Sequence, residues 1–170
     1  MLVGLPFAAG CTQPRGTYQE ARVLLVDGVP CFAAADNDEA RKSPPILAGL
    51  AVYEWEADKA RILWNRSFPD SPPLSPDDCI TYDPDSSDAA EDFSPLQPGN
   101  HYSVEINSHV PDGKSKDGGV DWKNRVYSAD FCLITDQEGG TPRVYQVGKD
   151  ESGRRDWSSC FAAGERGTTP

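Results

Sequence analysis

The sequence predicts an all-β domain, an antiparallel β-sandwich with long proline-rich loops and two disulfides. Three observations favour this class. Short runs of strand-forming residues recur at regular spacing between turn-forming residues. Glycine and proline, 15 of each, disfavour long helices. Four cysteines are dispersed through the body of the chain. An immunoglobulin-like sandwich also fits the strand spacing, although the Cys–Trp–Cys spacing of a true immunoglobulin domain is not evident.

The length of 170 residues fits a single domain, because a chain of this size can bury about two-thirds of its unfolded surface. We divide the sequence into a leader remnant at residues 1–10, a lipid-anchor tether at 11–20, one β-rich domain at 21–162 and a flexible tail at 163–170. No apolar run in the sequence approaches the ~20 residues of a membrane-spanning helix.

The first predicted hairpin joins residues 23–26 to residues 29–32. Asp27-Gly28 between them supplies the positive φ angles of a type I′ turn. Proline has no N–H to donate to a neighbouring strand, so Pro30 is expected to place its strand at a sheet edge.

A second hairpin is predicted from the β-rich runs at 50–55 and 61–64, and the polar segment 36–45 before it is expected to be a loop. Side chains alternate between the two faces of a strand. One face of the first run therefore carries Ala51, Tyr53 and Trp55.

Residues 67–98 hold seven prolines and are expected to be irregular, with Cys79 holding them to the body of the domain. The run 101–106 alternates polar and apolar residues. This alternation is the strongest strand signal in the sequence, and it directs three side chains to a core: Tyr102, Val104 and Ile106.

The composition of residues 111–119 predicts a mobile loop. Residues 126–135 and 144–147 predict a third hairpin, followed by a terminal segment containing Trp157 and stapled to the domain through Cys160.

The net charge of −11 excludes nucleic acid as a favoured ligand and disfavours anionic lipid surfaces. No lysine or arginine lies between Ser67 and Gly113, where much of the acid is concentrated. A solvated loop is the simpler interpretation of this stretch, and an acidic surface that steers a basic protein partner is the sharper one. The candidate partner-binding residues are Asp77, Asp78, Asp83, Asp85 and Asp88.

Four cysteines, Cys31, Cys79, Cys132 and Cys160, lack the CxxC spacing of a metal site, and the two histidines have no zinc-type spacing. We therefore expect two disulfides, no metal and no cofactor, and disulfides imply export. Three pairings are open, and the sequence alone does not choose among them. Among them we predict the sequential pairing, Cys31–Cys79 and Cys132–Cys160. It would tie the proline-rich segment to the first hairpin and the terminal segment to the third.

The opening apolar run ends in Ala8-Ala9-Gly10-Cys11, which looks like the lipobox of a bacterial lipoprotein. In a lipobox, small residues precede the cysteine that receives diacylglycerol, and the acyl chains then anchor the protein without a spanning helix. The leader is short and has no basic start, which suggests a translation start further upstream.

The ordered set of motifs resembles the type VI secretion immunity periplasmic lipoproteins. The set comprises the lipobox-like start, Gly-Val-Pro-Cys-Phe at 28–32, Asp-Asp-Cys-Ile-Thr-Tyr at 77–82, Pro-Gly-Asn-His-Tyr-Ser-Val at 98–104, Tyr-Ser-Ala-Asp-Phe-Cys at 127–132, and the final Cys160. The resemblance covers residues 11–161. It implies that Cys11 is lipidated and that the other four cysteines form structural disulfides.

The same resemblance implies a periplasmic protein that neutralises a cognate toxin, an effector secreted by sister cells. Thr12 after the lipidated cysteine favours the outer membrane, since inner-membrane retention in many lipoproteins depends on Asp at that position. The lipid anchor would be the only membrane contact.

Two functional classes remain open beside each other, and a third is disfavoured. The first is an immunity protein that occludes a toxin's active or substrate site, and the alternative is a structural or adhesion-type envelope lipoprotein with no toxin partner. Catalysis is disfavoured because the sequence lacks a GxSxG elbow, an HExxH motif and a glycine-rich phosphate loop.

Overall fold

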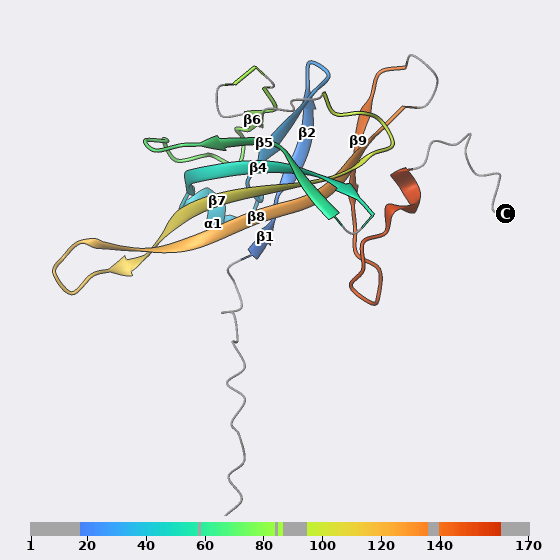
Figure 1. The fold of residues 1–170 in the computed structure, drawn as a ribbon. Helices are drawn as coiled ribbons and strands as arrows, with labels where there is room; N and C mark the ends of the chain where they lie inside the picture. Colours follow the sequence, from blue (N-terminus) through green and yellow to red (C-terminus); the bar gives the residue numbers. More distant parts are fainter. Residues whose placement is uncertain (1–17, 58, 84, 87–94, 136–139, 161–170) are drawn as a thin grey trace, which may run out of the picture.

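The computed structural model describes residues 18–57, 59–83, 85–86, 95–135 and 140–160. As predicted, the fold is mostly β, and its strands form two sheets that make a sandwich-like arrangement (Figure 1). The larger sheet has the order β1-β8-β7-β4-β5 with β9 also beside β8, and its strands are β1 (Tyr18–Glu20), β4 (Ile46–Glu56), β5 (Lys59–Ser67), β7 (His101–Lys114), β8 (Val120–Ile134) and β9 (Arg143–Val147). The smaller sheet has the order β2-β3-β6, with β2 (Arg22–Val26), β3 (Val29–Ala33) and β6 (Ile80–Thr81).

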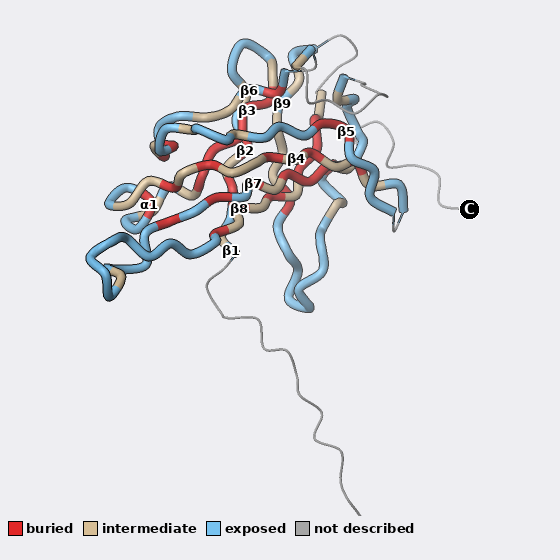
Figure 2. Tube along the Cα trace, turned by 60° about the vertical axis from the view of Figure 1, so that its left-hand side comes forward, coloured by how far each residue is buried: buried red, intermediate tan, exposed pale blue. Residues whose placement is uncertain are grey.

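The core lies between one face of the larger sheet and the smaller sheet. Tyr102, Val104 and Ile106 are fully buried there, as their alternation predicted. Phe32 of β3 packs on Phe131 of β8 with ring centroids 5.8 Å apart. Figure 2 shows that burial is concentrated in the central parts of the strands. Leu74 and Tyr82, which lie in connecting segments, also join this core. Packing of the two sheets therefore rests on large aromatic side chains, which bury the most apolar area per residue.

A corner in the chain closes one side of the sandwich. After β1 the chain turns at Ala21 and enters β2 of the other sheet, and the Ala21 N–H donates to the Ser128 carbonyl at 2.9 Å. The Gln146 side chain of β9 completes the corner. It donates to the Ala21 carbonyl at 2.9 Å and accepts from the Val23 N–H at 3.2 Å. A side-chain amide thus substitutes for a neighbouring backbone strand at the point where the chain changes sheets.

The predicted hairpins are all present, and the first has Asp27 and Gly28 at φ 52° and 81°. The expectation for Pro30 was wrong, because β3 lies between β2 and β6. Proline is tolerated there because β6 pairs only with Cys31 and Phe32.

Two predicted loops contain regular structure. Residues 36–45 include the one-turn helix α1 (Asp38–Lys42), whose start is capped by the Asn37 side chain accepting from the Ala40 N–H at 2.9 Å. In the segment 111–119, β7 continues as far as Lys114, and β8 begins directly after the segment at Val120. The two strands form a hairpin arm that extends beyond the rest of the sandwich (Figure 1). Composition alone did not indicate the helix or the hairpin arm. The Asn37 cap stabilises the helix, and backbone pairing stabilises the arm, despite the loop-forming residues in both segments.

The disulfides follow the sequential pairing, Cys31–Cys79 and Cys132–Cys160. The first joins β3 to the segment just before β6 within the smaller sheet, and the second joins β8 to the short 3-10 helix η1 (Trp157–Cys160). Neither bond connects the two sheets, as the disulfide of an immunoglobulin domain does. The immunoglobulin-like detail of the prediction is therefore not supported.

Strand pairing includes residues before position 21. Residues 18–20, assigned from the sequence to the tether, form β1 and pair in parallel with β8. This is the one parallel pairing among the described strands of an otherwise antiparallel fold. Among the described residues, no helix has both the length and the apolar character needed to cross a bilayer.

Candidate functional site

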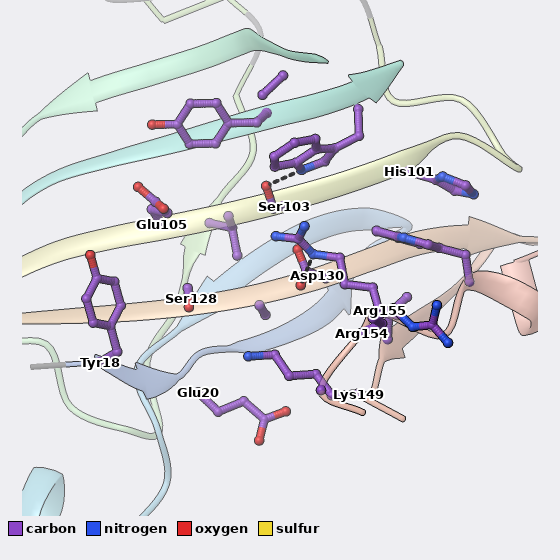
Figure 3. A pocket seen from close by; sticks show the side chains of 18 of the residues that line it. Tyr18, Glu20, His101, Ser103, Glu105, Ser128, Asp130, Lys149, Arg154 and Arg155 are labelled. Atoms are coloured by element: carbon purple, nitrogen blue, oxygen red, sulfur yellow. Dashed lines mark hydrogen bonds and ion pairs between the residues drawn. The ribbon is translucent and has the colours of Figure 1, made fainter. Parts of the chain in front are cut away.

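A cleft of about 1210 Å³ lies on the outer face of the larger sheet, the face turned away from the core. Its floor comes from the central strands β4, β7 and β8 and from β1, and the segment 148–157 after β9 overhangs one side (Figure 3). Period-two alternation explains the floor. The same strands that bury one set of side chains present the other set to this face.

The short side chain of Ser128 hollows the floor. It lies in a cross-strand row with Glu105 of β7 and Glu20 of β1. Because Ser128 is short, the two carboxylates stand on either side of a gap. Their strands are two spacings apart, which is about 10 Å.

The Glu105 carboxylate lies among aromatic side chains. Tyr53 donates a hydrogen bond to it, and the pKa of Tyr53 is raised by burial, by the negative charge of Glu105 and by that bond. The hydroxyl of Tyr18 points toward Glu105 from the opposite side (Figure 3). Tyr18 is 58% exposed, so its ring is open to a partner.

The overhanging segment is held to the floor by Arg155. Its guanidinium donates to Asp130 at 2.6 Å and lies 4.7 Å from the ring centroid of Trp55. The Trp55 indole in turn donates to the Ser103 hydroxyl at 2.8 Å. A cation–π contact, an ion pair and a hydrogen bond thus fix this wall of the cleft in one arrangement.

The end of the cleft is closed by a stacked pair. The rings of His101 and Trp157 are 4.2 Å apart and inclined by 14°. Burial lowers the pKa of His101, which favours the neutral imidazole near neutral pH. The Cys132–Cys160 disulfide anchors the helix that carries Trp157, so the position of this wall depends on that bond.

The predicted acidic residues lie away from the cleft, around β6 of the smaller sheet. Four of them, Asp77, Asp78, Asp83 and Asp85, are exposed, whereas Asp88 falls outside the described residues. Asp77 pairs with Arg41 of α1 at 3.2 Å, so its charge is partly balanced. The smaller sheet packs on the inner face of the larger one, and the core therefore separates these acids from the cleft.

Of the five cysteines, the structure describes four. Cys11 lies outside the described residues, as do the leader and the tail. The other four cysteines are all in disulfides. Within the described ranges, no group of three or more side chains is arranged to hold a metal ion.

Sequence reasoning missed the cleft, although part of its signal was visible. The alternation that directs Tyr102, Val104 and Ile106 inward also directs His101, Ser103 and Glu105 outward. Ala51, Tyr53 and Trp55 were expected to share a face, and they share this outer one. Nothing local indicated that β1 or the segment 148–157 would join these strands.

Comparison with known proteins adds no assignment. No protein-family model matches the sequence, and neither a curated protein nor a solved structure gives a match.

Proposed function

We propose that this protein is a periplasmic immunity protein that binds a cognate secreted toxin and blocks its active or substrate site, and that the outer face of the larger sheet is the contact surface. One observation carries the proposal: the wide cleft on this face is lined by two tyrosines, two tryptophans and two arginines. These residue types dominate the energetics of protein–protein interfaces. A standard interface buries roughly 1,600 Å² in total, and an open sheet face can offer its half of that area.

The lipoprotein location is part of the same proposal. Two disulfides suit an oxidising compartment such as the periplasm. Cys11 would carry the lipid and hold the domain at the outer membrane through the residues before β1. With a complete leader, the protein should incorporate labelled palmitate, and Cys11→Ser should abolish the labelling; equal labelling of both would refute the anchor.

A growth assay in cells that contain the toxin tests the immunity function. A candidate toxin, sought among the products of neighbouring genes, is directed to the periplasm of a host cell. Co-export of this protein should restore growth, and the two purified proteins should elute as one complex. A double variant of the cleft, Tyr18→Asp with Trp55→Asp, should lose both effects.

A variant on the other side of the core serves as the control. Asp78→Asn with Asp85→Asn should protect as the unaltered protein does. No protection and no complex, with the exported protein folded and disulfide-bonded, would reject the immunity function and favour the structural or adhesion-type lipoprotein.

A further inference from the structure

We infer that the cleft on the outer sheet face docks a basic segment of the partner protein, with an arginine or lysine side chain lying between Tyr18 and Tyr53 against Glu105. The inference rests on the proposed function and adds the chemistry of the partner.

The floor of the cleft carries negative charge. Three carboxylates line the cleft, from Glu20, Glu105 and Asp130. Asp130 is already paired with Arg155 at 2.6 Å. Glu20 accepts from the Gln146 amide at 2.7 Å, and Glu105 accepts from the Tyr53 hydroxyl. Both of these donors are neutral, so among the described residues neither glutamate has an ion-pair partner.

Aromatic side chains lie on both sides of the Glu105 carboxylate. The faces of tyrosine rings attract cations, and the attraction strengthens when the cation is shielded from water. Tyr18 and Tyr53 flank Glu105 on β1 and β4, and Ser128 leaves space above the sheet between Glu105 and Glu20. A guanidinium or ammonium group entering this space would meet a carboxylate and aromatic rings together.

Positive charges on the overhanging segment set the orientation of the partner. The overhanging segment brings the other charges that face the cleft: Lys149, Arg154 and Arg155. Arg155 is committed to Asp130 and Arg154 pairs with Asp150 at 3.5 Å, whereas Lys149 has no ion pair among the described residues. Lys149 therefore repels a cation from its own side of the cleft. The partner's cation is directed to the end formed by Tyr18 and Glu105.

A protein segment fits the cleft better than a free ion does. The volume of about 1210 Å³ exceeds what one side chain fills. Among the described residues no cluster is suited to a metal ion. The net charge of −11 also favours encounter with a basic partner.

The test uses short peptides as probes of the cleft. The first is Ac-Ser-Gly-Arg-Gly-Ser-NH2, the second replaces arginine by lysine, and the third replaces it by citrulline, which keeps the shape of arginine without its charge. Each is titrated into the full-length, disulfide-bonded protein and followed by NMR. The charged peptides should shift the amide signals of Tyr18, Glu105 and Ser128, and citrulline should not.

Two substitutions should act in opposite directions. Glu105→Gln should weaken binding of the arginine peptide about fivefold, because it removes the charge but keeps the hydrogen-bonding shape. Lys149→Gln should strengthen binding by about twofold, because it removes the repulsion at the other end. Tyr18→Leu, at an exposed position, should weaken binding without threatening the fold.

The matched control is Asp83→Asn, which removes one negative charge near β6. It should leave the peptide affinity unchanged. Equal binding of the citrulline peptide, or equal weakening by Asp83→Asn and Glu105→Gln, would overturn the inference.

The inference and the proposed function can fail separately. If the protein protects cells but Glu105→Gln affects neither the peptides nor the toxin complex, the cationic contact is wrong and the immunity function stands. If the arginine peptide binds as described but no protection occurs, the cleft recognises a basic segment of a partner other than a toxin.

Discussion

Removing the Cys132–Cys160 disulfide should destabilise the protein and loosen one wall of the cleft. The bond closes a loop of 28 residues between β8 and the final 3-10 helix. By the chain-entropy relation, a loop of that length stabilises the folded state by about 3.6 kcal/mol at 25 °C. For a domain of this size, each kcal/mol corresponds to about 2–4 °C, so Cys132→Ala with Cys160→Ala should lower the melting temperature by roughly 7–14 °C.

The structure also predicts where the loosening occurs. Cys132, Val147 and Cys160 form a small hydrophobic cluster, supported by Trp157, that is separate from the main core. Without the disulfide, the segment 148–160 should open locally, while the main core stays packed. The stack of Trp157 on His101 should be lost with it.

The comparison variant is Cys31→Ala with Cys79→Ala. By the same relation, its loop of 48 residues stabilises the folded state by about 4.1 kcal/mol, so the free energy of unfolding should fall by a similar amount. The local effect should differ, because Cys31 precedes the core residue Phe32 in the smaller sheet.

Urea unfolding measures the loss in the free energy of unfolding of the whole domain, and native-state hydrogen exchange measures local opening. In Cys132→Ala with Cys160→Ala, amides of the segment 148–160 should exchange rapidly while those of β4 and β7 remain protected. A stability loss below about 1 kcal/mol, or loss of protection in β4 and β7 before the segment 148–160, would refute the reasoning.

Three further predictions concern the surface, the sheet corner and pH. If the acidic stretch steers the toxin, Asp78→Asn with Asp85→Asn should slow association severalfold at low salt, and the effect should fade toward 0.15 M salt, where the Debye length is about 8 Å. The control removes the same charge from two exposed sites elsewhere, Asp121→Asn and Glu151→Gln, and identical stopped-flow rates for both variants would favour a merely solvating loop. Gln146→Ala should lower the free energy of unfolding by about 2 kcal/mol, because it leaves partly buried backbone groups at the sheet corner without partners; a loss under about 0.5 kcal/mol in urea unfolding would contradict this role. The hydrogen bond from Arg125 lowers the pKa of Glu39, so the stability from this pair should be present above the ordinary carboxyl pKa and lost as the pH falls below it. Between pH 7 and pH 3, the free energy of unfolding should therefore fall less in Glu39→Gln than in the unaltered protein. The difference between the two falls should be only roughly 1 kcal/mol, because Glu39 is half exposed. Equal falls would show that the pair adds nothing to stability.

The position of Asp77 shows what the structure adds to the steering hypothesis. From sequence, Asp77 belongs with the other acids of the stretch. In the structure it pairs with Arg41, so neutralising it would break an ion pair as well as remove a charge. Asp78 and Asp85 have no such contact among the described residues and test steering more cleanly.

The sequence by itself determined the features that depend on neighbours along the chain. Alternation placed Tyr102, Val104 and Ile106 in the core, and Asp27-Gly28 specified the first turn. Both signals are local, because side-chain direction and turn geometry depend on a few consecutive residues. The sequential disulfide pairing was one of three possibilities and needed the fold to decide it.

Only the tertiary structure decided which strands lie side by side and which sheet face stays uncovered. β1 pairs with β8 more than a hundred residues away, and Gln146 holds the corner where β1 passes into β2. These contacts bring Tyr18 to Glu105 and fold the segment 148–157 over the same face. Such pairings are set by packing between distant segments, and no pattern within one segment encodes them. The cleft is therefore a product of sheet order, and each strand contributes only the side chains that line it.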